Sequence, residues 1–155
     1  MAVSAVVLIL GGLAGCASDD MGPDWMTWDQ ANREYQAAVA SFPFALPEGV
    51  SFTPDARPPG GDTHGRYGRG YGAMQAYVFA EYAWACTALR ERVHDPVAAS
   101  AALDEVQRIH DSPGIQANFS DPGGGWQAMI DKTRLGDWAD FAQTYSGFGG
   151  ETCGA

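Results

Sequence analysis

Positive charge is scarce in this chain, which has nine Lys and Arg residues against nineteen Asp and Glu among 155 residues. The formal net charge of -10 would repel nucleic-acid phosphates and anionic lipid headgroups. We therefore expect no nucleic-acid partner, and we expect a covalent lipid rather than surface charge to provide any membrane attachment. Long hydrophobic runs are also missing, because residues 2–15 fall short of the roughly 20 apolar residues that a membrane-spanning helix needs.

The motifs of several common enzyme classes are absent as well. There is no P-loop, no serine in a nucleophile-elbow setting and no dinucleotide fingerprint, since the glycines of residues 68–72 follow no predicted strand. Three histidines, His64, His94 and His110, suggest a metal site. However, His94 and His110 lie at opposite ends of one predicted helix, about 24 Å apart at 1.5 Å per residue, so they cannot share a zinc ion. The sequence thus predicts no catalytic motif, no metal and no cofactor.

Only three cysteines are present, and the first has a specific setting. Residues 13–16 read Leu-Ala-Gly-Cys at the end of an apolar run, which is typical of a bacterial lipoprotein whose cysteine receives a diacylglycerol before cleavage. We expect residues 1–15 to be a signal peptide, Cys16 to be lipidated and residues 16–26 to be a tether. The protein is then extracytoplasmic and anchored to the cell membrane through its N-terminal lipid. An uncleaved anchor and a plain secretory peptide are the alternatives.

Residues 1–4 carry no Lys or Arg, although an export signal normally has positive charge there. This departure leaves open a start of translation upstream of Met1.

The other two cysteines, Cys86 and Cys153, form an even pair in an oxidising compartment. We predict a disulfide between them. It would close a loop of about 68 residues and stabilise the fold by roughly 4 kcal/mol, because it restricts the unfolded chain. The alternative is two free thiols, one buried and one on a frayed tail.

Hydrophobic periodicity predicts one mainly α-helical domain over residues 27–155, with about four or five helices. The expected helices cover residues 28–41, 71–93 and 96–110, with shorter ones around 126–130 and 138–145. Thr27 and Gln30 form a capping box for the first, and Asp95 before Pro96 begins the third. The helix over 71–93 is apolar around most of its circumference, which is typical of a central helix. Together with the helix that follows, it should form an antiparallel hairpin.

Proline and glycine are dense across residues 43–70, and this density excludes a helix there. Five large apolar residues nevertheless occur at its start: Phe42, Phe44, Leu46, Val50 and Phe52. We therefore expect a long extended arm packed on the helical body, followed by a looser loop over residues 57–70.

Arg66, Tyr67, Arg69 and Tyr71 interleave arginine with tyrosine in this loop. Such a composition can stack on bases or sugars, which makes these four residues candidates for binding an envelope glycan. The alternative is a mobile loop whose arginines pair with the acidic body. The five tryptophans could likewise line a glycan groove, or they could pack in the core.

Glu81 is a further candidate, because it lies in mid-helix among aromatic residues. A buried carboxylate needs a partner, or it keeps its proton and becomes a candidate general acid. A hydrolase would also need a second carboxylate within about 5 to 10 Å, and the sequence nominates none. The alternative is a structural carboxylate bonded by a tyrosine hydroxyl or by an arginine of the arm.

The arm over residues 42–52 is followed by Trp84-Ala85-Cys86, Gly125-Trp126, Gly136-Asp137 and Cys153-Gly154. This succession resembles uncharacterised exported proteins and lipoproteins of actinobacteria over residues 42–154. The resemblance implies export, a mainly helical domain and a central-helix cysteine that can meet the terminal one. It assigns no activity and no catalytic residue.

The expected function is a non-enzymatic structural or interaction role in the cell envelope, with an envelope protein or a glycan as partner. One alternative is a binding module for envelope glycans or small molecules, built near residues 66–71. Another is an envelope hydrolase built on Glu81.

Overall fold

The computed structural model describes residues 24–56, 63–146 and 153. The helices are α1 (Trp28–Ala40), α2 (Tyr71–Glu91), α3 (Pro96–His110), α4 (Pro113–Gln116), α5 (Gly125–Arg134) and α6 (Ala139–Tyr145), and the strands are β1 (Trp25–Met26) and β2 (Tyr67–Gly68). The prediction of a small, mainly helical domain is confirmed.

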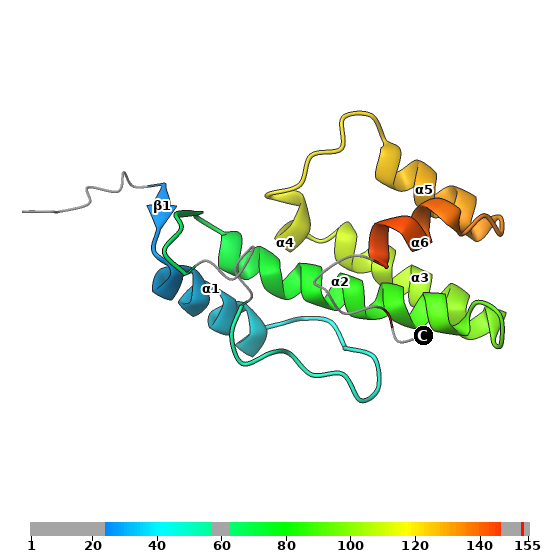
Figure 1. The fold of residues 1–155 in the computed structure, drawn as a ribbon, viewed down its shortest axis with the longest axis horizontal. Helices are drawn as coiled ribbons and strands as arrows, with labels where there is room; N and C mark the ends of the chain where they lie inside the picture. The colour runs from blue at the N-terminus through cyan, green and yellow to red at the C-terminus, as the bar shows by residue number, and fades with distance from the viewer. Residues whose placement is uncertain (1–23, 57–62, 147–152, 154–155) are drawn as a thin grey trace, which may run out of the picture.

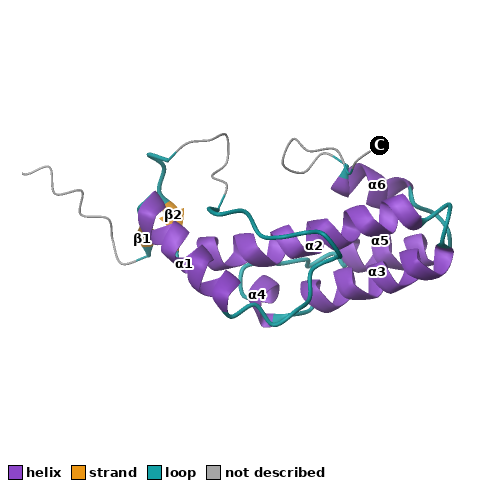
Figure 2. Ribbon diagram, turned by 90° about the horizontal axis from the view of Figure 1, so that it is seen from below, coloured by secondary structure: helices purple, strands orange, loops and turns teal. Residues whose placement is uncertain are grey.

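Helix α2 is the centre of the molecule and contacts α1, α3, α4 and α6 (Figure 1). Its buried positions are mostly alanine, which lets neighbouring helices approach closely. The closest approach is at Gly72, where an added Cβ would lie 1.8 Å from the backbone oxygen of Ala31 in α1. Helices α2 and α3 form the predicted antiparallel hairpin, with α5 and α6 packed beside it (Figure 2).

Two predicted helix starts are confirmed by their caps. The Gln30 backbone N–H donates to the Thr27 hydroxyl, and the Thr27 backbone N–H donates to the Gln30 side chain at 2.8 Å. The Asp95 carboxylate accepts from the backbone N–H groups of Val97 and Ala98 at the start of α3. These caps satisfy backbone donors that have no partner inside the helix.

Three short elements were not expected from the sequence. Ser112-Pro113-Gly114 does end α3, but Pro113 then occupies the first position of α4. Strand β1 pairs antiparallel with β2, in the register Trp25 to Gly68 and Met26 to Tyr67. The predicted loop over 57–70 is therefore partly paired, and residues 57–62 lie outside the described residues. Elements of two to four residues are too short for a periodic pattern to be recognised.

The main core lies between the α2–α3 hairpin and the two last helices. Its largest members are Leu103, Met129, Ile130, Phe141 and Tyr145. Two smaller clusters lie at the α1 end, one around Tyr67 and one around Tyr35.

The arm contacts the helical body through aromatic rings. The Phe42 ring lies 5.0 Å from the Tyr77 ring, and the Phe52 ring lies 5.3 Å from the Phe79 ring, both on α2. The indole N–H of Trp84 donates to the backbone oxygen of Ala45 at 2.9 Å. These contacts place the start of the arm along α2.

Cys86 and Cys153 form a disulfide with 4.9 Å between their Cα atoms, as predicted. The bond attaches Cys153 to the C-terminal half of α2. Most of the N-terminal predictions, including the signal peptide and lipidation at Cys16, lie outside the described residues. Of the helices that the structure describes, none combines the length and apolarity that crossing a bilayer requires.

Candidate functional site

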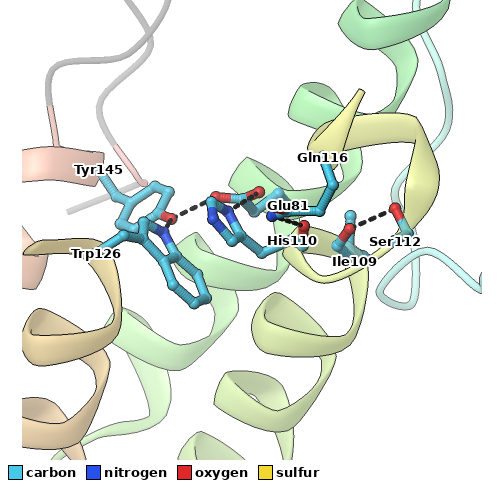
Figure 3. A network of polar contacts seen from close by, with 7 residues as sticks. All are labelled: Glu81, Ile109, His110, Ser112, Gln116, Trp126 and Tyr145. Carbon is cyan, nitrogen blue, oxygen red and sulfur yellow. Dashed lines mark hydrogen bonds and ion pairs between the residues drawn. The ribbon is translucent and has the colours of Figure 1, made fainter. Parts of the chain in front are cut away.

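Among the described residues, one buried carboxylate and one buried imidazole meet between the hairpin and the last helices (Figure 3). Glu81, in the middle of α2, is 8% exposed, and His110, in the last turn of α3, is 5% exposed. The Tyr145 hydroxyl of α6 donates to Glu81 Oε1 at 2.5 Å. His110 Nδ1 lies 3.2 Å from Glu81 Oε2. Both carboxylate oxygens are therefore engaged.

Trp126 of α5 completes this network. Its indole N–H donates to the Tyr145 oxygen at 3.1 Å, and its ring stacks on the His110 imidazole. The Phe119 ring makes a second contact with the His110 imidazole, edge-on and with 4.6 Å between the two ring centroids. Aromatic rings thus enclose His110, while its Nδ1 faces Glu81.

Local hydrogen bonds hold these side chains in place. The Asp121 carboxylate accepts from the backbone N–H groups of Gly125 and Trp126, which fixes the start of α5. Beyond the end of α3, the Gln116 side chain donates to the His110 backbone oxygen at 2.9 Å. The Ser112 hydroxyl donates to the Ile109 backbone oxygen at 2.5 Å. These bonds satisfy carbonyls that the end of α3 leaves without helical partners.

The electrostatics of the network favour a neutral tyrosine. Burial raises the pKa of the Tyr145 phenol well above its ordinary value, and the adjacent Glu81 carboxylate raises that pKa further, by its charge and by the hydrogen bond it accepts. A protonated His110 would form an ion pair with Glu81. Among the described residues, no buried side-chain polar atom lacks a hydrogen-bond partner.

The sequence-based alternative for Glu81, a carboxylate bonded by a tyrosine hydroxyl, matches this geometry. The partners His110, Tyr145 and Trp126 were not recognised from the sequence. The position of His110 in the sequence indicates only a side chain that is favourable at a helix C-terminus. The predicted antiparallel hairpin could have identified His110 as a partner of Glu81. A turn at residues 92–95 brings Glu81 opposite the last turns of α3. His110 is the one ionisable residue on the buried face of that helix.

The other predicted binding residues lie elsewhere, around β2 and the start of α2. Arg66 and Arg69 are exposed, whereas Tyr67 is buried between the rings of Trp28, at 5.5 Å, and Tyr71, at 5.0 Å. Ten residues of helix separate Tyr71 from Glu81, about 15 Å at 1.5 Å per residue. The structure therefore does not join Glu81 to this segment.

The tryptophans are divided between packing and exposure. Trp28, Trp84, Trp126 and Trp138 are half-buried against core clusters or the arm, whereas Trp25 is 50% exposed.

Within residues 24–56, 63–146 and 153, no group of three or more His, Cys, Asp or Glu side chains is placed to hold a metal ion. His94 lies exposed just before α3, at the opposite end of that helix from His110.

The geometry is that of a closed polar network that joins four helices. It keeps the Tyr145 hydroxyl protonated, because the pKa of that group is raised, and its contacts join α5 and α6 to the hairpin. A scan against protein-family models found no match, and searches of curated proteins and of solved structures found no similar chain.

Proposed function

We propose that this protein is a lipid-anchored, extracytoplasmic component of the cell envelope with a non-enzymatic structural or interaction role. The Leu-Ala-Gly-Cys sequence at residues 13–16 supports the anchor. The disulfide between Cys86 and Cys153 supports an oxidising compartment, because such bonds persist outside the cytosol and are rare within it.

The contacts that Glu81 makes with Tyr145 and His110 are the observation that supports a non-enzymatic role. A general acid must reach the leaving group of its substrate. Glu81 is 8% exposed, and its two oxygens bond Tyr145 and His110. A buried carboxylate with a partner for each oxygen is typical of a structural network. Of the functions considered for this protein, the hydrolase therefore has the least support.

A glycan-binding role is the second candidate, and one specific contact favours it. Strand pairing places Trp25 opposite Gly68, so the exposed indole lies beside the segment that carries Arg66 and Arg69. An exposed aromatic ring near arginines is a surface on which sugar rings stack.

Intact-mass measurement of the protein purified from membranes tests the anchor. We expect residues 1–15 to be missing and Cys16 to carry a diacylglycerol. The Cys16→Ser variant should instead be soluble or unprocessed. An unmodified Cys16 in the wild-type protein would refute lipid anchoring.

Rescue of a deletion strain tests whether the protein is an enzyme that uses Glu81, and sedimentation with cell-wall glycan tests glycan binding. At equal protein levels, Glu81→Gln should restore the wild-type envelope as well as the unaltered chain does, because the amide keeps the oxygen that accepts from Tyr145. Loss of rescue by a correctly folded Glu81→Gln protein would favour an enzyme. Loss of sedimentation with isolated cell-wall glycan in Trp25→Ala, but not in Trp28→Phe, would favour the glycan-binding module.

A further inference from the structure

A hollow of about 280 Å³ opens at the end of the molecule opposite β1 and β2. Its walls come from Arg92 in the turn between α2 and α3, the first half of α3, the end of α5 and the turn between α5 and α6. The two turns lie at the same end of the molecule in both views (Figures 1 and 2). The hollow is separate from the Glu81 network and from the segment over residues 66–71.

The charge of this hollow is opposite to that of the chain. Its described lining includes two arginines, Arg92 and Arg134, and no carboxylate, although acidic residues outnumber basic ones nineteen to nine. Arg134 is held by Asp104, with 2.7 Å between Nη1 and Oδ1, and by Gln107. Arg92 is exposed and makes no side-chain hydrogen bond or ion pair with any residue that the structure describes. Arg92 is therefore an available cation.

The rest of the hollow is largely apolar. Leu103, which is 2% exposed, and the half-buried Trp138 contribute to its lining. Residues adjacent to the lining in sequence are unusually exposed for their type: Val93 is 73%, Val97 79% and Leu135 89% exposed. Apolar side chains gathered around a depression are a common feature of binding sites.

We propose that this hollow binds a small carboxylate with an aliphatic body. The carboxylate pairs with the guanidinium of Arg92, whose planar fork of N–H donors matches two oxygens. The aliphatic body lies against Trp138 and Leu103. A singly charged carboxylate also suits an acidic protein better than a doubly charged phosphate, because the net charge of -10 repels each added negative charge.

Nuclear magnetic resonance titration of the folded, disulfide-bonded protein tests this proposal. The probe is N-acetyl-leucine, and the matched uncharged probe is N-acetyl-leucinamide. N-acetyl-leucine should shift the Trp138 indole N–H and the Arg92 backbone resonances saturably, and its affinity should exceed that of the amide by about tenfold, because only the acid forms a charge-assisted bond.

Two variants isolate the role of Arg92. Arg92→Gln should remove the preference for the acid, whereas Arg90→Gln, which alters an exposed arginine of the same helix end that does not line the hollow, should leave it unchanged. Equal affinity of the two probes, shifts confined to other parts of the molecule, no saturable shift, or an acid preference that survives in folded Arg92→Gln would each overturn the proposal.

Discussion

The His110 imidazole lies flat on the Trp126 indole, with 3.5 Å between the ring centroids and 5° between the ring planes. The stack joins the end of α3 to the start of α5, and it holds His110 Nδ1 toward Glu81. Because Trp126 also donates to Tyr145, one side chain contacts two of the three ionisable members of the network. The network should therefore contribute to stability as a unit.

Removal of the Tyr145 hydroxyl tests this contribution. Tyr145→Phe leaves Glu81 Oε1 without its donor, and we expect the free energy of unfolding to fall by about 1.5 to 3 kcal/mol, the range for hydrogen bonds to charged groups. Urea unfolding gives the value. Tyr77→Phe is the matched control, since among the described residues the Tyr77 hydroxyl makes no hydrogen bond, and it should change stability by less than about 0.5 kcal/mol. Equal effects of the two variants would contradict the prediction.

High pH should destabilise the protein through the same residue. The pKa of Tyr145 is raised in the fold by burial and then by Glu81, so the folded state holds a proton that the unfolded state releases above its ordinary pKa of 10.0. The stabilisation is complete below that pH and is lost as pH rises above it. Urea unfolding from pH 8 to 11 should show a steeper decline for the wild type than for Tyr145→Phe. Parallel declines would be inconsistent with this origin.

Loss of the disulfide should cost roughly 4 kcal/mol, the chain-entropy value for a loop of about 68 residues. The double variant Cys86→Ala/Cys153→Ala measures this in urea, and it should match the reduced wild type. Alkylation of the unfolded, unreduced protein provides the check, because Cys86 and Cys153 should remain unmodified. Labelling of both would show that they are free thiols.

The close approach of α1 and α2 predicts a severe effect at Gly72. A Cβ there would overlap the Ala31 backbone oxygen, so Gly72→Ala must separate the helices and should cost about 1 to 3 kcal/mol. Gly123→Ala is the control, because no heavy atom lies within 4 Å of the added Cβ. A thermal unfolding midpoint for Gly72→Ala as high as that of Gly123→Ala would be evidence against this packing.

The arm should behave as part of the core. Phe52 contacts the rings of Tyr35, Phe42 and Phe79, and Phe52→Ala should lower the free energy of unfolding by about 2 to 5 kcal/mol. Val97→Ala, at a 79% exposed helical position, should have little effect. Rapid hydrogen exchange throughout residues 42–52 would instead mean that the arm is not docked in solution.

Local signals in the sequence predicted the helices well. Thr27 with Gln30 and Asp95 with Pro96 specify helix starts within four residues, so no tertiary information is needed to recognise them. The expected helix ends extended one or two residues beyond Ala40 and Glu91, which is the usual uncertainty of a helix end.

The site could be predicted only in part. Glu81 was recognised because a mid-helix carboxylate among aromatic residues needs a partner. Its partners come from helices 29 and 64 residues further along the chain, so their identity depends on helix packing. The hollow beside Arg92 could not be predicted for the same reason, because its walls come from α3, from the end of α5 and from the turns beside them, which only the fold brings together.

The disulfide also has a consequence for the order of events during biosynthesis. Ribosomes make a chain from its N-terminus, and 67 positions separate Cys86 from Cys153, so α1, α2 and α3 are complete before the second thiol exists. An oxidant that acts early would meet Cys86 without its native partner. The competing partners are then Cys16 and Cys86 of another nascent molecule. If Cys16 is acylated as we propose, prompt acylation would remove it from this competition, and late oxidation would favour the native pair.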